Sequence, residues 1–407
     1  MKSRKKGIIL VLSVILIFSI GLLVNNLMTN NKDTAKPKKK TVAAVKKKKE
    51  TPPKPKEPFN IDFTGDIMFD WDLRPVLAEK GMDYPFNNVR EELKSSDYTF
   101  VDLETAITTR TKKVPYQEFW IKSDPSSLTA LKNAGVDMVN ISNNHILDYY
   151  EDGLLDTTAA LRANNLAYVG AGKNEDEAYQ LKVADIKGNK VGFMSFCHFF
   201  PNTGWIADED TPGVTNGYDI NLVEEKIKEE RAKNKDIDYM VVYFHWGVEK
   251  TNTPVDYQTQ YVKKLVDDNL VDAIVASHPH WLQGFEVYKD VPIAYSLGNF
   301  LFPDYVSGHS AETGIYKLNF DQGKVTAHFD PGIISGNQIN MLDGSAKTAQ
   351  LNYLQSISPN ATINSNGDIS AKIKKADASS VYTVPCISLF FITNDSYGQF
   401  PLPNKNQ

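Results

Sequence analysis

The chain has 407 residues, 42% of them hydrophobic, which is ample for a large core, and its two cysteines, Cys197 and Cys386, are too few for a disulfide framework or a Cys-rich metal site. The net charge of −5 divides unevenly, since residues 1–58 carry 15 Lys/Arg and 3 Asp/Glu (+12) whereas the other 30 Lys/Arg and 47 Asp/Glu give −17. An acidic body lacks the basic surface that phosphate contacts need, so we expect no nucleic-acid partner.

The first predicted element is a membrane anchor. Residues 7–24 read GIILVLSVILIFSIGLLV without a charge, and the apolar character continues to Leu27 and Met28, which is enough to span a bilayer as a helix. Residues 1–6, MKSRKK, supply the positive charge of a cytoplasmic tip. No small-x-small cleavage site or lipobox cysteine follows. We therefore expect an uncleaved single-pass anchor over residues 7–28 that leaves the acidic body extracellular.

A linker is predicted over residues 29–58, which are mostly Lys, Pro, Thr and Ala. Such a segment cannot bury enough apolar surface to fold, and its prolines keep it extended. It is either a solvated spacer or a spacer that also touches an anionic wall or capsule polymer.

From Phe59 onward, short β-rich apolar runs alternate with helical stretches. The expected strands are residues 59–64, 98–103, 137–141, 237–244 and 272–276, and the expected helices are residues 124–134, 151–164 and 255–269. In the first helix, Asp124 and Pro125 predict an N-cap and a proline at the first helical position, and Gly135 predicts the end. The alternation predicts an α/β fold with a partly parallel central sheet covered on both faces.

Polar side chains suited to metal binding follow each of these strands. In chain order they are Asp66, Glu104, Asn144 with His145, His245 with Glu249, and His278 with His280. The carboxyl ends of strands converge on one crevice in open α/β sheets. Each residue alone could be a turn, a cap or a core histidine, but five such strand ends in succession favour one common site.

The types of side chain in this set indicate the chemistry. Imidazole, carboxylate and amide oxygen without thiolate suit Mn, Fe or Zn, with Mg also open. Six candidate ligands exceed the needs of one tetrahedral ion, so we expect one or two ions. Two ions can generate a hydroxide near neutral pH and clamp the oxygens of a phosphoryl or acyl transfer. His145 would then donate a proton to the leaving group or a hydrogen bond to developing negative charge.

Six motifs carry a family resemblance: FTGDIMF, VDLETAIT, NISNNHILDY, YFHWGVE, ASHPHWLQGFEVY and IAYSLGNFLF, in that order over roughly residues 60–302. Together they resemble the poly-γ-glutamate capsule biosynthesis proteins of the CapA/PgsA type, which are related to calcineurin-like metallophosphoesterases. The resemblance implies a four-layered α/β/β/α sandwich on an anchored, extracellular protein. It also implies poly-γ-glutamate and other capsule synthesis or export subunits as partners.

Carried over by position, the resemblance assigns one catalytic residue, His145, and six metal ligands: Asp66, Glu104, Asn144, His245, His278 and His280. Two departures weaken the shell of the first metal. Met68 stands where the phosphoesterase pattern has a histidine, and Glu104 replaces the bridging aspartate. A site that binds a single ion therefore remains an alternative to a two-ion site.

Four further residues are predicted to support the ligands. Asp148, Glu249 and Asn299 could orient imidazoles, or could be turn or cap residues. Asn143 should hold the loop by backbone hydrogen bonds, while Asn144 aims its amide oxygen at a cation.

Beyond residue 302 the motifs end. Residues 313–330 predict a hairpin around Asp321-Gln322-Gly323, and His309 and His328 are expected to be structural or exposed. We expect a metallophosphoesterase-like domain over residues 59–332 and an extension over 333–407 that completes or decorates the sandwich. Two functions stay open: a metal-dependent hydrolase of a phosphoester or amide bond, or a non-catalytic capsule subunit that keeps a degenerate metal site.

Overall fold

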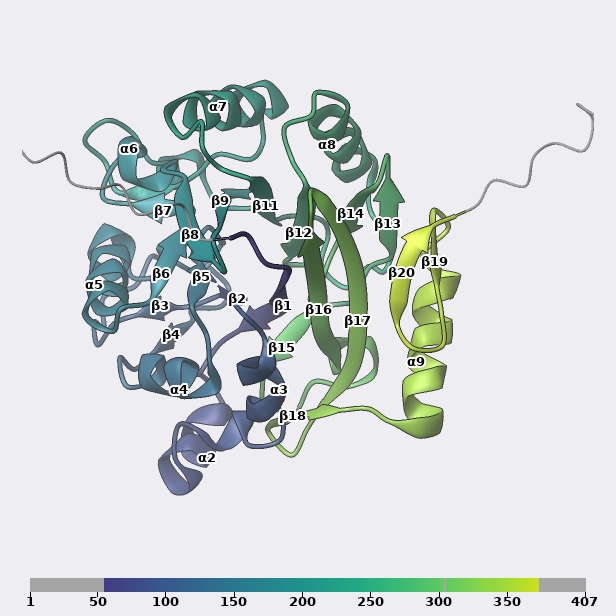
Figure 1. Ribbon diagram of the computed structural model, residues 1–407. Coiled ribbons are helices and arrows are strands. Elements are labelled where there is room, and N and C mark those ends of the chain that lie inside the picture. The colour runs from purple at the N-terminus through teal and green to yellow at the C-terminus, as the bar shows by residue number, and fades with distance from the viewer. Residues whose placement is uncertain (1–54, 304, 373–407) are drawn as a thin grey trace, which may run out of the picture. The chain divides into compact units, whose positions relative to one another are not determined.

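A pair of β-sheets lies at the centre of the computed structural model, which describes residues 55–303 and 305–372 (Figure 1). The predicted anchor over residues 7–28, most of the linker and Cys386 lie outside the described residues. Among the residues that are described, no helix has both the length and the apolar character to cross a membrane.

The larger sheet has ten strands in the order β19-β20-β17-β16-β1-β2-β5-β6, with β15 beside β1 and β18 beside β17. Strands β1, β2, β5 and β6 run parallel, whereas β16 and β17 form an antiparallel hairpin. The strands are β1 (Phe59–Ile67), β2 (Thr99–Leu103), β5 (Met138–Asn140), β6 (Ala167–Val169), β15 (Asn299–Leu301), β16 (Glu312–Asp321), β17 (Lys324–Ser335), β18 (Gln338–Met341), β19 (Ala361–Ile363) and β20 (Asp368–Ala371).

The smaller sheet has six strands in the order β13-β14-β12-β11-β9-β8, and β11 pairs in parallel with β9 and β12. These strands are β8 (Lys182–Ile186), β9 (Asn189–Cys197), β11 (Tyr239–His245), β12 (Ala273–Ser277), β13 (Phe285–Tyr288) and β14 (Val291–Ala294). Two short pairs stand apart: β3 (Ala106–Ile107) with β4 (Lys122–Ser123), and β7 (Ala171–Gly172) with β10 (Gly213–Val214).

The two sheets pack face to face through apolar side chains. Phe63 and Phe100 of the larger sheet meet Phe193 and Tyr243 of the smaller one, and the ring centroids of Phe100 and Tyr243 are 5.1 Å apart. Removing a ring such as that of Phe100 from water stabilises the fold by about 1.5–3 kcal/mol. The inter-sheet core therefore fixes the strand ends of both sheets relative to each other.

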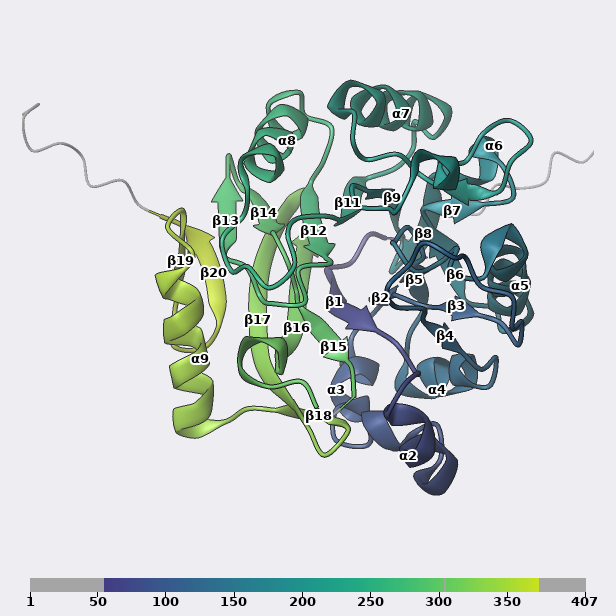
Figure 2. The same ribbon diagram turned by 180° about the vertical axis from the view of Figure 1, so that it is seen from behind.

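Helices cover both outer faces (Figure 2). The outer face of the larger sheet packs against α2 (Leu73–Lys80), α3 (Arg90–Ser95), α4 (Ser127–Ala134) and α5 (Tyr150–Ala163). The outer face of the smaller sheet packs against α6 (Glu175–Ala178), α7 (Ile220–Lys233) and α8 (Asp256–Asp267), while α9 (Gly344–Ser356) joins the inter-sheet core. Three short 3₁₀ turns complete the elements: η1 (Tyr84–Phe86), η2 (Thr203–Trp205) and η3 (Gly308–Ser310). The layers are helix, sheet, sheet, helix, in the expected order.

Strand β1 shows how the sequence places a polar residue at a strand end. Ile61 and Phe63 alternate into the inter-sheet core, and Gly65 precedes Asp66. A Cβ at Gly65 would lie 1.9 Å from the carbonyl oxygen of Gly298, so only glycine allows β15 to approach. That approach sets Asp66 beside Asn299.

Two local predictions about turns and caps have different outcomes. The predicted N-cap at Asp124 is wrong: α4 begins at Ser127, because the carboxylate of Asp124 accepts the backbone N–H of Ser126 in a turn that precedes the helix. The predicted end at Gly135 is confirmed by its left-handed φ of 96°. The predicted hairpin is also confirmed, and residue 332, the expected domain boundary, lies inside β17.

Candidate metal centre

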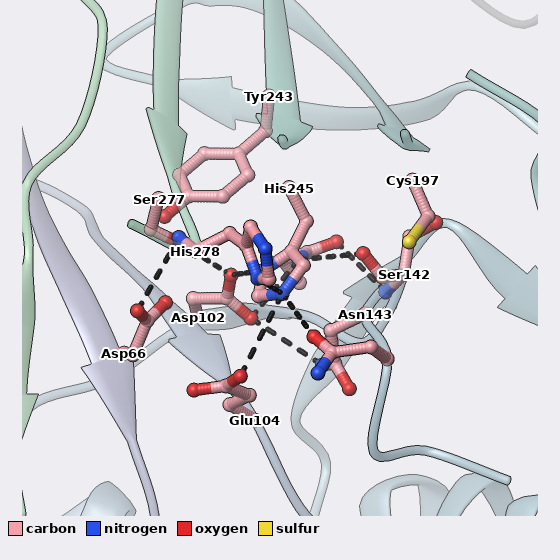
Figure 3. A network of polar contacts seen from close by, with 12 residues as sticks. Asp66, Asp102, Glu104, Ser142, Asn143, Cys197, Tyr243, His245, Ser277 and His278 are labelled. Carbon is pink, nitrogen blue, oxygen red and sulfur yellow. Dashed lines mark hydrogen bonds and ion pairs between the residues drawn. The ribbon is translucent and has the colours of Figure 1, made fainter. Parts of the chain in front are cut away.

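The strand ends of both sheets meet at one place. The larger sheet brings a carboxylate from β1 (Asp66), a carboxylate just after β2 (Glu104) and an amide from the loop after β5 (Asn144). The smaller sheet brings three imidazoles, from the end of β11 and from just after β12: His245, His278 and His280. Figure 3 shows the rings of His245 and His278 pointing toward the carboxylates of the larger sheet. All six predicted ligands thus come together across the two sheets.

Four of these side chains form a first group. The amide oxygen of Asn144 lies 2.6 Å from Nε2 of His245, and Nδ1 of His278 lies 3.1 Å from the same nitrogen. Oε1 of Glu104 is 3.7 Å from Nε2 of His245. Ligand atoms of Glu104, His245 and His278 all lie within 4.8 Å of one another, close enough for one ion to contact them all.

A second group shares Glu104. Nδ1 of His280 lies 3.3 Å from Oδ2 of Asp66 and 3.8 Å from Oε2 of Glu104. Glu104 therefore directs one carboxylate oxygen toward each group, as a carboxylate that bridges two ions would. Met68 adds no ligand here, because its side chain packs in an apolar cluster with Ile121, Phe302 and Ile334.

The buried atoms of the two groups fit a cation. Both carboxylate oxygens of Glu104, Oδ1 of Asp66 and Nε2 of His278 are buried without a hydrogen-bond partner. Leaving such groups unpaired in the interior costs several kcal/mol, which a bound cation offsets. The nitrogen and oxygen donor set without thiolate is compatible with a divalent metal.

The electrostatics agree with this interpretation. Burial raises the pKa of Glu104 well above its ordinary value, and the charges of Asp66 and Asp102 raise it further. Burial also lowers the pKa of the imidazole of His278, helped by the nearby rings of His245 and His280. In the described part of the chain, no lysine or arginine forms an ion pair with Asp66, Asp102 or Glu104. Their ion-pair partners are imidazoles, and a bound divalent cation would add countercharge to these acids.

Asp102 is a functional residue that the sequence analysis missed. Its Oδ2 lies 2.9 Å from Nδ1 of His245 and accepts the hydroxyl of Ser277 at 2.5 Å. The amide of Asn140 donates to its other oxygen at 3.0 Å. Asp102 thus holds the ring of His245 so that Nε2 faces the first group. The signal was its position two residues before Glu104, which places both carboxylates on one side of an extended chain.

His145 lies at the edge of the centre and is 8% exposed. Its Nδ1 is 2.8 Å from Oδ2 of Asp148, and Nε2 is 4.0 Å from Oε1 of Glu104. Asp148 also accepts the backbone N–H of Ile121 and the amide of Gln117, which in turn donates to the carbonyl of Asn144. Gln117 was not predicted, and no sequence pattern marks it.

The adjacent asparagines have different contacts. Asn143 donates its amide to the carbonyl of Leu103 at 2.9 Å, and its oxygen accepts the backbone N–H of His145 at 3.1 Å. Asn143 therefore braces the loop, whereas Asn144 directs its oxygen into the first group.

Asn299 and Glu249 were predicted to orient imidazoles, and their positions differ. The amide oxygen of Asn299 is 2.9 Å from Nδ1 of His280, and its amide donates to the carbonyl of Ser310. Glu249 is exposed and, within the described residues, makes no hydrogen bond to an imidazole, because Gly247 turns the chain outward at φ +100°. Only its charge affects the centre. Burial and the charges of Asp66 and Asp102 raise the pKa of Glu104 most, and the charge of Glu249 raises it a little further.

The loop after β12 is strained. His278 and His280 have φ values of +100° and +57°, in the left-handed region that favours glycine. Such conformations cost of order 1–3 kcal/mol each and persist where the surroundings enforce them, often at functional sites. Here the backbone turns both rings of the HPH motif toward the carboxylates of the larger sheet.

The part of the sequence that forms the centre is similar to known proteins. The family model described as bacterial capsule synthesis protein PGA_cap matches residues 60–304. Capsule biosynthesis protein CapA of Bacillus anthracis is 34% identical over 250 residues, which is 60% of this chain and 60% of that protein. PGA biosynthesis protein CapA of Bacillus subtilis (strain 168) is 33% identical over 242 residues, 59% of this chain and 62% of that protein. The chain thus spans less than two thirds of the length of these relatives.

Solved structures show a more distant likeness. The calcineurin-like phosphoesterase YfkN from Bacillus subtilis has a TM-score of 0.39 and 15% sequence identity, over 74% of this chain and 98% of that chain.

Proposed function

The chain belongs to the bacterial capsule synthesis protein family PGA_cap, and from this premise we propose that it is a membrane-anchored, extracellular component of poly-γ-glutamate capsule synthesis or export with a metal-dependent hydrolase site. One observation supports the hydrolase most: Glu104 stands between two groups of potential ligands with both oxygens buried and unpaired. A protein that merely bound a polymer would have no need of such a carboxylate.

Each of the two groups of residues would bind one ion. Asn144, His245, His278 and Glu104 would hold one ion, and Asp66, His280 and Glu104 the other. Two divalent ions held there would supply a hydroxide near neutral pH and would stabilise the charge that develops in phosphoryl or acyl transfer. Asp102 keeps the proton of His245 on Nδ1, so that Nε2 stays available as a ligand.

His145 is suited to the proton transfer that completes hydrolysis. Asp148 contacts Nδ1 of His145 at 2.8 Å, which orients the ring and leaves Nε2 on the open side. That nitrogen lies on the side of Glu104, where a leaving group would stand. General acid catalysis of this kind contributes roughly 10²–10⁴-fold to a rate.

Metal analysis of the purified full-length chain, coupled to a screen of phosphomonoesters, phosphodiesters and γ-glutamyl amides, tests this proposal. We expect at least one divalent ion per chain and turnover of one substrate class. Asp66→Asn and His280→Ala should lose both. His309→Ala is the matched control, because His309 binds Glu312 and stacks on Tyr353 outside the two groups. Ligand variants with full metal content and full activity would refute the hydrolase.

The anchor and the outward location are supported by the uncharged run over residues 7–24 and the basic tip before it. Membrane fractionation and protease treatment of intact cells test them. We expect the full chain to sediment with membranes and to be cleaved from outside, and a chain lacking residues 1–28 to leave the membrane fraction.

Poly-γ-glutamate or another anionic wall polymer is the proposed macromolecular partner, with other capsule subunits. The acidic body, at −17, disfavours broad electrostatic capture of a polyanion, so contact should be confined to the basic linker or to the metal-lined centre.

A non-catalytic subunit is the second candidate function, and Met68 favours it. With an apolar side chain there, the second group among the described residues holds Asp66, Glu104 and His280, a weak shell for an ion. If ligand variants preserve capsule output while deletion of residues 1–58 abolishes it, the chain acts as a scaffold.

A further inference from the structure

Large aromatic side chains lie exposed on two loops that flank the metal centre. Phe119 is 56% exposed and Tyr305 is 54% exposed. Scattered apolar residues on a surface are ordinary, but both of these exposed rings pack against Trp71, and a contiguous apolar patch of this kind marks an interaction site.

The rings form a continuous row that starts at a metal ligand. The ring of Phe302 lies 5.2 Å from that of His280 and 6.5 Å from that of Trp71. Trp71 in turn lies 5.8 Å from Phe119 and 6.5 Å from Tyr305, to which it is nearly parallel at 25°. We call Phe302, Trp71, Phe119 and Tyr305 the aromatic shelf.

The shelf is held in place by the same loop that supports the proposed proton donor. Phe119 lies on residues 108–121, which join β3 to β4 without a helix or strand, and loops of this length in compact domains are usually functional. Gln117 of this loop donates to Asp148, the partner of His145. Trp71 has a left-handed φ of +54° and donates its indole N–H to the carbonyl of Trp120. Strain and hydrogen bonds thus fix the shelf beside the centre.

Two acidic residues next to the shelf in the sequence, Asp72 and Glu118, form no ion pair within the described residues, whereas a third, Asp70, pairs with Arg74. Asp72 follows Trp71, and its charge, after burial, helps to raise the pKa of the Tyr305 phenol to about 12. Glu118 precedes Phe119 and is exposed. The three cations of loop 108–121 are engaged in other contacts: Arg110 pairs with Asp152 and Asp156, Lys112 lies over the ring of Tyr150, and Lys113 lies over the ring of Trp120.

Carboxylates beside aromatic faces repel a polyanion, so such a surface disfavours a polyanionic ligand. A purely apolar chain would make no favourable contact with the carboxylates. Such a surface suits an uncharged sugar. The C–H groups on the face of a pyranose pack against an aromatic ring, and hydroxyls at its edge donate to carboxylates.

We propose that the aromatic shelf binds a pyranose ring of a neutral wall glycan and seats it beside the metal centre. The binding stands without the hydrolase, and the idea that the sugar belongs to the hydrolysed substrate rests on the proposed function.

Isothermal titration of the full-length chain, with and without a chelator, tests the proposal with two probes of matched length: the tetrasaccharide of N-acetylglucosamine and a tetramer of γ-linked glutamate. We expect the tetrasaccharide to bind the metal-free chain with little dependence on salt, and any binding of the glutamate tetramer to the basic linker to be unchanged by Phe119→Ala. Phe119→Ala and Tyr305→Ala should each weaken tetrasaccharide binding about 3- to 10-fold, the usual contribution of one aromatic contact.

Both variants remove exposed rings, so the fold should survive. Tyr218→Ala is the control, since Tyr218 is 48% exposed but packs on His198 instead of the shelf. The proposal is overturned if the tetrasaccharide does not bind, if both shelf variants bind it as tightly as the parent, or if the glutamate tetramer binds the metal-free chain and Phe119→Ala abolishes that binding. A chain that binds the sugar and hydrolyses nothing would refute the hydrolase and leave this inference standing.

Discussion

The amide oxygen of Asn144 and Nε2 of His245 face each other at 2.6 Å, while Nδ1 of the same ring lies 2.9 Å from Asp102. When Nδ1 donates its proton to Asp102, the two facing atoms are both acceptors and repel each other. A cation between them removes the repulsion, so this pair is the most sensitive place at which to test the metal.

Asn144 and His145 should separate metal binding from proton transfer. Asn144→Ala removes a ligand oxygen and should lower metal content. His145→Ala should leave the metal bound and lower turnover roughly 10²–10⁴-fold, as expected for loss of a general acid. Metal stoichiometry and rate are measured on the same samples. If His145→Ala strips the metal, His145 is a ligand; if neither change has an effect, the SNNH segment is only a turn.

Asp102 and Asp148 form a second matched pair, because each carboxylate contacts Nδ1 of one histidine. Asp102→Asn loosens the ring of a ligand and should weaken metal affinity roughly 10–100-fold. Asp148→Asn should leave metal affinity unchanged and lower turnover only. Competition with a fluorescent chelator measures the affinities. Equal losses of affinity in both variants would contradict the division of roles.

Gly65→Ala should destabilise the fold, because the new Cβ would meet the backbone oxygen of Gly298 at 1.9 Å and neither strand can yield without moving Asp66. Overpacking of this kind costs about 3 kcal/mol or more where backbone must shift. Gly336→Ala is the control: nothing lies within 4 Å of its Cβ, and only its φ of +62° is unfavourable. Urea denaturation measures both, and equal free energies of unfolding would show that β1 and β15 can separate freely.

The contact of His328 with Asp330 should make stability depend on pH. Burial raises the pKa of Asp330, but hydrogen bonds from His328 and Lys347 lower it to about 2. The bond to Asp330 raises the pKa of His328 above 6.5. The contribution of Asp330 is present above pH 3.8 and lost as the pH falls toward 2; that of His328 is present below pH 6.5 and lost as the pH rises through its raised pKa.

His328→Gln should therefore lower the free energy of unfolding most between about pH 4 and 6.5. The expected loss is about 1 kcal/mol after allowance for solvent screening, or about 2 °C in Tm. Calorimetric scans from pH 4 to 9 should show the difference in Tm from the parent narrowing as the pH rises beyond 6.5. A difference of constant size would mean that His328 acts through packing alone.

The convergence of the six candidate ligands could be predicted, because each one lies at the end of an apolar run and the same pattern marks both the strand and the polar residue at its end. Asp102 was missed because it lies inside β2, where it reads as an ordinary strand residue. Its contact with Ser277 depends on how two sheets dock, which no local pattern encodes. Gln117 was missed because it lies in a loop, where no periodic pattern marks a residue. Glu249 was placed wrongly because the backbone turns outward at Gly247, and the side-chain pattern does not reveal that turn.

The fold was predictable to a similar degree. Alternating strands and helices indicated the α/β class, but the layer order came from family resemblance alone. Strands β18 to β20 escaped prediction because they are three or four residues long and mix polar with apolar side chains, and they gain their order from pairing with β17 and from packing under α9.

The division of the centre, with oxygen ligands on the larger sheet and imidazoles on the smaller one, determines when an ion can enter. An unfolded chain scatters these groups from Asp66 to His280, so no site exists until the sheets have docked. An ion bound there would link the two sheets and would add about 2.7 kcal/mol of stability when its concentration is a hundred times Kd. Since nitrogen and oxygen sites of this kind rank the transition metals by a common order of affinity, local supply decides among them. If such an ion is bound, its identity would therefore reflect the compartment in which the chain folds.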